Sequence, residues 1–285
     1  MRRALILSLT LLLGLAACGD GGGGTEPTPS PTTASPSPTE SETEATQEST
    51  AWFVRAADGW MWVEPETHLV PQTEGVARAA MEVLFAGETD DPNLDSMVEG
   101  VEVLGADIDG DVLTVDVSGD IDPDGAGRGS AEEIAFAQQL AYTAAQFDGV
   151  RAVRLLVDGE EITDLWGHLD WSQPIEPDPF AETPITIDEP GWGAEVPQRA
   201  LTASGEANTF EATLAVRLID PDGAVAEEEW ITATSGSGTR GTWEHTFSSE
   251  LDRPGTWAVE AEEPDPSGGE EGRPPLVVRS EFTVT

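Results

Sequence analysis

The sequence predicts an α+β domain followed by an immunoglobulin-like β-sandwich, behind an N-terminal leader and a polar tether. Between residues 51 and 172, strand-like segments alternate with two segments of helical periodicity, which is typical of a mixed sheet packed against helices. From residue 184 to 285 only short strand-like segments appear, with turn residues between them. The proline-containing stretch 173–183 shows neither pattern, so we interpret it as the linker.

The chain begins with a leader of the secretory kind. Two arginines precede an almost wholly apolar stretch at 4–13, which is shorter than the roughly 20 residues that span a membrane. Leu15-Ala16-Ala17-Cys18 follows and resembles the lipobox of bacterial lipoproteins. The resemblance implies removal of residues 1–17, lipidation of the Cys18 thiol, and attachment to membrane lipid on the extracytoplasmic face of the cell membrane. An ordinary secretory signal with a chance cysteine is the alternative.

Composition restricts the classes of partner. Residues 18–50 are rich in Gly, Pro, Ser, Thr and Glu, which predicts a disordered tether. The formal net charge of the chain is -42, with 55 acidic residues against 13 basic ones. Such a surface repels phosphates, and we therefore exclude nucleic acid as a partner. Cys18 is the single cysteine of the chain, so we expect no disulfide within it.

The first half of the α+β domain begins with strand-like segments at 51–55, 60–63 and 68–71. Helical periodicity over 73–86 places Val76, Ala80, Val83 and Leu84 on one face, with Thr73 as N-cap and Gly87 as the terminator. Further strands are predicted at 101–104 and 112–117, joined by a turn at Asp109-Gly110.

A second helix is predicted from Ser130 to about Phe147. Ser130 and Glu133 have the spacing of a capping box, and a stripe of apolar residues follows. A last strand is predicted at 150–157, which gives the order β-β-α-β-β-α-β and a mixed sheet with two helices. The stripe consists of Phe136, Leu140, Ala144 and Phe147.

Several runs of this domain resemble the GerMN family of sporulation and spore germination proteins. The most specific are QLAYTAAQFDGV at 139–150 and VRLLVDG at 153–159, beside the stretch 73–85 and VDVS at 115–118. The resemblance extends from about Trp52 to Trp166, and implies protein–protein association, including self-association through the α+β sheet. Phe85 to Thr89 departs from the family pattern, so the exit of the first helix is expected to differ.

The second domain contains seven predicted strands without a disulfide. Asp222-Gly223 and Pro254-Gly255 are turn signals, and Trp243, Phe247 and Trp257 are candidates for the centre of the core. The runs ITIDEP at 185–190, GEANTFEA at 205–212 and GTW at 241–243 resemble Gmad2, the immunoglobulin-like domain of bacterial spore germination. The predicted strands are 185–188, 201–205, 211–219, 228–233, 242–248, 256–261 and 276–285.

No pattern in the sequence indicates an active site or a cofactor. The histidines His68, His168 and His245 lie far apart and have no metal or triad spacing. Asp120, Asp122, Asp124 and Gly125 match the first half of a calcium loop, although position 12 is Ala131 and not Glu. Calcium binding and a solvated polar loop remain alternatives for this segment.

Trp60 and Trp62 alternate and therefore share one face of a strand. An exposed pair would stack on sugars, whereas a buried pair would cover the sheet or a domain interface.

The leading interpretation is a non-enzymatic, lipid-anchored protein with two interaction modules at the cell envelope. Its partner is an envelope protein or a second copy. The alternatives are a lipoprotein that binds cell-wall glycan, and an accessory of a membrane signalling protein.

Overall fold

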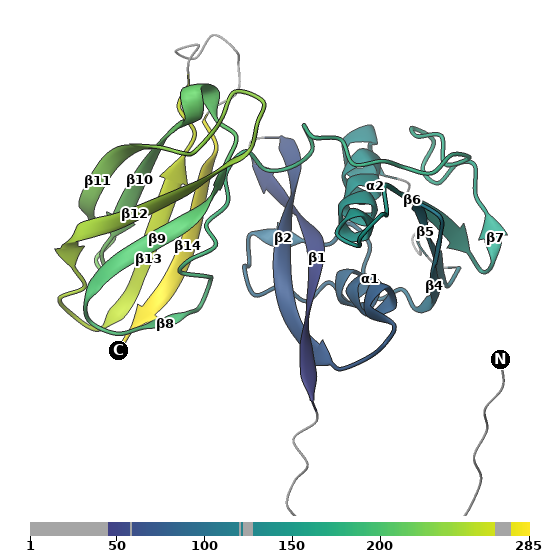
Figure 1. Ribbon diagram of the computed structural model, residues 1–285, viewed down its shortest axis with the longest axis horizontal. Coiled ribbons are helices and arrows are strands. Elements are labelled where there is room, and N and C mark those ends of the chain that lie inside the picture. Colours follow the sequence, from purple (N-terminus) through teal and green to yellow (C-terminus); the bar gives the residue numbers. More distant parts are fainter. Residues whose placement is uncertain (1–44, 58, 120, 122–127, 266–274) are drawn as a thin grey trace, which may run out of the picture. The chain divides into compact units, whose positions relative to one another are not determined.

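The computed structural model describes residues 45–57, 59–119, 121, 128–265 and 275–285. A long antiparallel hairpin lies at the centre of its first domain (Figure 1). Its strands are β1 (Thr46–Ala57) and β2 (Trp60–Pro71), and the short β3 (Leu94–Asp95) pairs with the other side of β1. The strand-like segments at 60–63 and 68–71 both belong to β2, so two strands precede the first helix, as in the predicted order. Strand β1 also begins earlier than predicted, at a residue assigned to the tether.

The outer edge of β2 is protected by its prolines. Val63 donates to the Ala181 carbonyl at 2.7 Å and accepts from the Thr183 amide at 2.9 Å, so its backbone points away from β1. The side to which the backbone N–H and C=O groups point alternates along a strand. The nitrogens of Pro65 and Pro71 therefore also face the side away from β1. Proline has no N–H to offer there, which blunts the edge against unwanted strand pairing.

The first helix, α1 (Val76–Ala86), is shorter at its start than predicted. Gly75 is the N-cap, and the Thr73 hydroxyl accepts the Gly75 amide at 3.0 Å in a turn before the helix. The prediction of Thr73 as N-cap was therefore wrong by two residues. Gly87 does end the helix, with a φ of 69° that favours glycine. The buried face is centred on Ala80, Met81 and Leu84, whereas Val76 is exposed.

Four strands form a second sheet in this domain, in the order β4-β5-β6-β7. Only β5 and β6 are parallel, and the connection between them contains the second helix. The Asp109-Gly110 turn is confirmed, but the strand before it starts later than predicted and is longer. The predicted single mixed sheet is thus two sheets. The strands are β4 (Val103–Asp109), β5 (Val112–Val117), β6 (Ala152–Val157) and β7 (Glu160–Glu161).

The second helix, α2 (Ser130–Ala145), starts with a different cap from the one predicted. Gly129 is the N-cap, and its amide donates to the Glu132 carboxylate at 2.6 Å. Glu133 is fully buried instead, and its carboxylate accepts from the Trp166 and His168 amides and from the Trp171 indole. The predicted capping role of Ser130 and Glu133 was wrong, because Glu133 faces a distant loop. Phe136, Leu140 and Ala144 line the core as predicted.

Helix α2 also closes the free edge of β1. Thr143 accepts the Trp52 amide at 3.0 Å, Gln139 donates to the Trp52 carbonyl at 3.1 Å, and Gln146 donates to the Thr50 carbonyl at 2.7 Å. The three side chains follow each other along one helix face. They satisfy strand groups that would otherwise lack partners, which joins the hairpin to the rest of the domain.

The second domain is a sandwich of the predicted class, in which every strand pair is antiparallel except β14 with the short β8. A five-stranded sheet in the order β11-β10-β13-β14-β8 faces the two-stranded sheet β12-β9 (Figure 1). Trp243, Phe247 and Trp257 are buried in its core, which confirms that prediction. The predicted strand 185–188 is not a regular strand, but it lies along β9 through bridges at Ile185 and Glu189 and through the Thr186 and Asp188 amides. The elements are β8 (Glu195–Val196), β9 (Ala200–Ala207), the 3-10 turn η1 (Phe210–Ala212), β10 (Thr213–Ile219), β11 (Val225–Thr232), β12 (Gly241–Glu250), β13 (Gly255–Glu262) and β14 (Val277–Val284).

Glu44–Thr285 form one compact unit, and both hydrophobic cores lie within it. We therefore expect the fragment 45–285 to fold without the residues before it.

Candidate functional site

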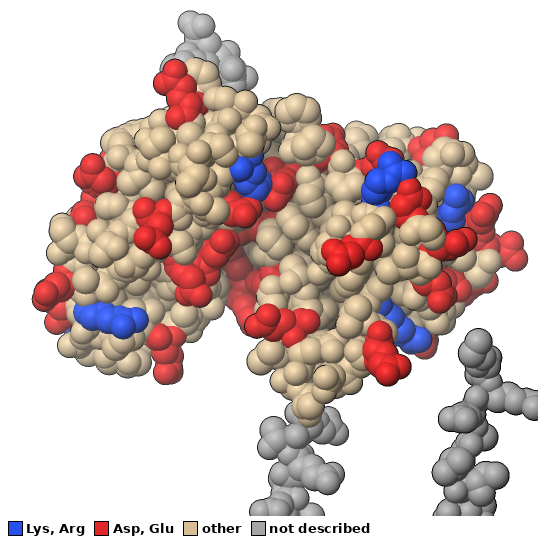
Figure 2. Space-filling view, in the orientation of Figure 1, with Lys and Arg blue, Asp and Glu red and all other residues tan. Residues whose placement is uncertain are grey.

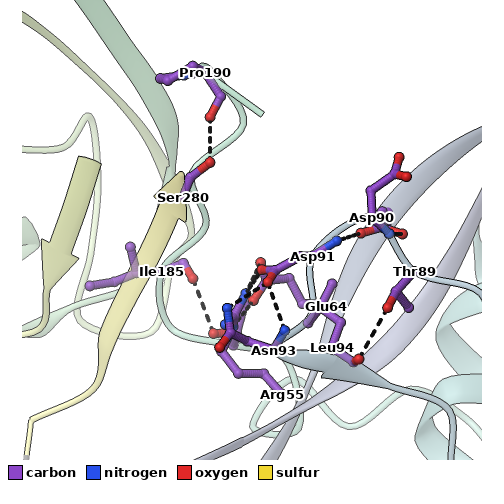
Figure 3. A network of polar contacts seen from close by, with 12 residues as sticks. Arg55, Glu64, Thr89, Asp90, Asp91, Asn93, Leu94, Ile185, Pro190 and Ser280 are labelled. Atoms are coloured by element: carbon purple, nitrogen blue, oxygen red, sulfur yellow. Dashed lines mark hydrogen bonds and ion pairs between the residues drawn. The ribbon is translucent and has the colours of Figure 1, made fainter. Parts of the chain in front are cut away.

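A buried ion-pair network links β1, β2 and the loop before β3 (Figure 3). Arg55 contacts Glu64 at 2.6 Å and 3.0 Å and Asp91 at 2.7 Å, and all three residues are at most 8% exposed. Burial disfavours the charge of Arg55, but the hydrogen bonds that its guanidinium donates to the two carboxylates raise its pKa above the ordinary value. Because each group is paired, this network holds the fold together and offers no free acid or base.

A polar cleft of about 560 Å³ adjoins this network. In it the Glu66 carboxylate accepts the amides of Asp90 and Asp91, each at 2.9 Å. Asp188 accepts from the Thr186 hydroxyl, and Arg279 pairs with Glu260. These charged groups thus make hydrogen bonds and ion pairs within the surrounding structure.

The predicted tryptophan pair lies at a pocket of about 270 Å³. The rings of Trp60 and Trp62 are stacked, with centroids 6.3 Å apart and planes 16° from parallel. Trp60 is 52% exposed, but Trp62 is 8% exposed and belongs to the core of the second domain. Trp60 is thus exposed and Trp62 is buried, so the two residues do not form an exposed pair, and sugar stacking stays a prediction.

Other parts of the pocket were not predicted from the sequence. Phe180 is 87% exposed and lies in the segment 179–184, together with Glu182. Asn208, at the end of β9, adds an amide. Phe180 follows three prolines in the linker, and nothing in its local pattern marks it as part of a site.

An apolar groove of about 530 Å³ runs between α1 and the end of β2. Val70 and Pro71 line it from the strand, and Ala79, Val83 and Ala86 line it from the helix. Periodicity places Val83 on a core face, but the structure leaves it only partly buried. The groove lies where the N-terminal segment joins the domain, because the Gln72 amide donates to the Ala45 carbonyl at 2.9 Å.

Acidic side chains are scattered over the visible face among uncharged residues, and a few basic side chains lie between them (Figure 2). The histidines are dispersed: His68 contacts Glu66, His245 contacts Glu227, and His168 contacts the Arg128 carbonyl. Among the described residues, no group of three or more His, Cys, Asp or Glu side chains is arranged to hold a metal.

Several predicted site residues lie outside the described residues. They are Cys18, Asp120, Asp122 and Asp124, so lipidation and calcium binding stay predictions. In the part of the chain that is described, no helix has both the length and the apolar character needed to cross a membrane.

Comparison with known families gives two matches in sequence order. Residues 38–163 match the Germane family, described as "Sporulation and spore germination". Residues 184–270 match Gmad2, the immunoglobulin-like domain of bacterial spore germination. A comparison with curated proteins finds no match.

Solved structures similar to parts of this chain include two from Bacillus subtilis. The first GerMN domain of the sporulation protein GerM is 20% identical, with a TM-score of 0.35, over 47% of this chain and 96% of that one. The tandem GerMN domains of GerM are 16% identical, with a TM-score of 0.39, over 52% of this chain and 51% of that one. A protein of Clostridium perfringens, described as a candidate lipoprotein, is 20% identical, with a TM-score of 0.34, over 46% of this chain and 87% of that one.

Proposed function

Because the chain carries a GerMN domain followed by a Gmad2 immunoglobulin-like domain, we propose that it is a lipid-anchored, non-enzymatic protein of the extracytoplasmic cell envelope. It acts by protein–protein association, in a role related to sporulation or spore germination. The observation that carries this proposal is the succession of the two families in one chain. Both family descriptions concern spore germination. Association between proteins requires a contact surface and does not require a catalytic group.

The anchor rests on Cys18, which stands directly after two small residues at the end of a secretory leader. In cells fed a clickable fatty acid, the wild-type chain should carry the label and sediment with membranes. Cys18→Ala should remove the label and release the protein from the membrane fraction. An unlabelled wild-type chain, or a Cys18→Ala chain that keeps its label, would refute lipidation at this residue.

The apolar groove between α1 and β2 is the association surface that we favour. Apolar side chains at a groove on a monomer mark interaction sites more often than scattered exposed ones do. Here Val76 is 45% exposed at the start of the helix that forms one wall. An apolar partner segment in the groove would cover Val83 and Ala86 and leave Arg78 and Glu82 at the rim.

A second copy is the weaker candidate partner, because each copy carries a formal charge of -42 and like charges repel. We therefore expect fragment 45–285 to sediment as a monomer in low salt. A photoreactive side chain at Val83 should crosslink in native membranes to one defined envelope protein. The same group at Ile134, an exposed position on α2, is the matched control. Equal crosslinking from the two positions, or none at Val83, would exclude the groove.

A further inference from the structure

The pocket at Trp60 combines an exposed aromatic face with hydrogen-bonding groups, and we infer that it binds one neutral pyranose ring of a polysaccharide. Trp60 is the first residue of β2 and stacks on the buried Trp62, which limits the orientations open to its ring. An aromatic ring held in this way loses little freedom when a ligand stacks on it. Its exposed face suits the C–H face of a sugar ring.

Phe180 supplies a second aromatic side chain, on a segment that is fastened to β2. The Phe180 amide donates to the Asp178 side chain at 2.9 Å, and the next residue, Ala181, accepts the Val63 amide at 2.7 Å. Phe180 is therefore presented by ordered backbone although it is 87% exposed. The prolines at 179 and 184 line the same pocket and stiffen the segment between them.

The polar groups of the pocket suit hydroxyl groups. Asn208 accepts the Gly238 amide through Oδ1 at 2.8 Å, which orients its amide nitrogen for donation. Glu182 is held by Arg240 at 3.1 Å, and burial raises its pKa, while Arg240 opposes the shift. An amide donor and a carboxylate acceptor beside aromatic faces can bind neighbouring hydroxyls of a sugar, since each hydroxyl both donates and accepts.

The charge of the pocket bears on which class of polysaccharide it can bind. The charged residues that line the pocket in the described part of the chain, Glu182 and Glu263, are both acidic. A phosphate- or carboxylate-bearing polymer would meet repulsion here, and from the acidic surface around it. The volume of about 270 Å³ lies below the range of roughly 300–1,000 Å³ usual for whole small-molecule sites, which suggests one ring of a longer chain.

A titration of fragment 45–285 with the neutral tetramer of N-acetylglucosamine, followed by calorimetry, tests this inference. The wild-type fragment should bind the tetramer, and Trp60→Ala and Phe180→Ala should each weaken binding at least tenfold. Trp230→Ala is the matched control, because Trp230 is 54% exposed and lies on β11 away from the pocket. The Trp230→Ala fragment should bind the tetramer with the same affinity as the wild-type fragment. Thermal unfolding of each variant verifies that it is folded.

Three outcomes would overturn the inference. The first is no heat from the neutral tetramer at millimolar concentration, and the second is equal weakening by Trp60→Ala and Trp230→Ala. The third is binding, at Trp60, of a synthetic proline-rich peptide with the sequence of residues 25–38 but not of the sugar, because aromatic and proline-lined grooves also accept such peptides. None of these outcomes tests the groove at α1, so the proposal of protein association is tested separately, by the crosslinking experiment at Val83.

Discussion

At the scale of single residues, the molecule depends on a few side chains whose partners are distant in sequence. Arg55 is the clearest, because two buried carboxylates depend on this one guanidinium. Glu133 is another, since its buried carboxylate accepts hydrogen bonds from three donors between 166 and 171. Gly205 is a third, because an added Cβ would lie 2.1 Å from the Thr186 carbonyl oxygen. Substitution of each of these residues is therefore expected to destabilise the fold for a different physical reason.

Arg55→Met should destabilise fragment 45–285 by about 3–5 kcal/mol, because it leaves Glu64 and Asp91 buried without their counter-charge. Urea unfolding followed by circular dichroism measures the change. Arg151→Met is the control, since Arg151 pairs with Asp111 on the exposed surface and should alter the midpoint little. Similar decreases in the free energy of unfolding of the two variants would show that the buried network stabilises the fold no more than an exposed ion pair does.

Gly205→Ala should cost roughly 1–3 kcal/mol or more, because the new methyl group has no room beside the Thr186 backbone and the Trp243 indole. The Trp243 indole, which donates to the Thr186 carbonyl at 3.1 Å, should lose that contact. Gly105→Ala is the matched control, because the nearest atom to its added Cβ is 3.9 Å away. Differential scanning calorimetry compares the two, and an unchanged Tm in Gly205→Ala would contradict the expected clash.

At the scale of elements, side chains replace backbone pairing where strands end or separate. Helix α2 closes one edge of β1 with Gln139, Thr143 and Gln146, as a further strand would otherwise do. In the sandwich, Glu227 of β11 accepts from Ser248 and Ser249 of β12, so one carboxylate joins strands of the two sheets. These contacts connect elements that share no backbone hydrogen bonds.

Gln139→Leu should cost at least about 2 kcal/mol, because the Met97 amide and the Trp52 and Asp95 carbonyls lose their partner in a buried environment. Hydrogen exchange measures the local effect, and the Met97 amide should exchange faster in the variant. Gln146 is exposed and donates only to the Thr50 and Thr143 carbonyls, so Gln146→Leu is expected to be milder. A smaller loss in Gln139→Leu than in Gln146→Leu would contradict the expected cost of leaving the buried partners of Gln139 unpaired.

The Glu227 contact predicts a pH dependence of stability. Desolvation alone would raise the pKa of this carboxyl, but hydrogen bonds from Ser248 and Ser249 lower it to about 2. A lowered folded-state pKa adds stability above the unfolded value of about 4.5, and that stability is lost as pH falls from 4.5 towards 2. The difference in Tm between wild type and Glu227→Gln should therefore shrink over this interval. A difference that stays constant would contradict the proposed ionised contact.

At the scale of the whole molecule, two hydrophobic cores work against a strong excess of negative charge. The chain carries 55 acidic and 13 basic residues, and Figure 2 shows that the acidic ones are spread over both domains. Mutual repulsion among them opposes the compact state and keeps copies apart, while the cores resist it. We expect the same charge to favour neutral or basic ligands over anionic ones, as both proposed surfaces require.

Salt should therefore stabilise the folded protein. Raising NaCl from 10 mM to 0.5 M shortens the screening length from about 30 Å to about 4 Å and reduces the repulsion between surface carboxylates. The Tm of fragment 45–285 should rise by several degrees over this range. A Tm that falls with salt would mean that the ion pairs, among them Arg217 with Glu262, outweigh the general repulsion.

The sequence by itself determined the class of each domain, because patterns of period 2 and 3.6 are local and report which face is buried. It also placed Phe136, Leu140, Trp243 and Trp257 in the cores. Only the tertiary structure decided that Glu133 reaches a distant loop, that Trp60 and Trp62 have different surroundings, and that Phe180 joins the pocket. Arg55 and Asp91 are 36 residues apart, and no local period encodes such a pair. The physical reason is that partners across a fold are brought together by packing, whereas periodicity records only the neighbourhood along the chain.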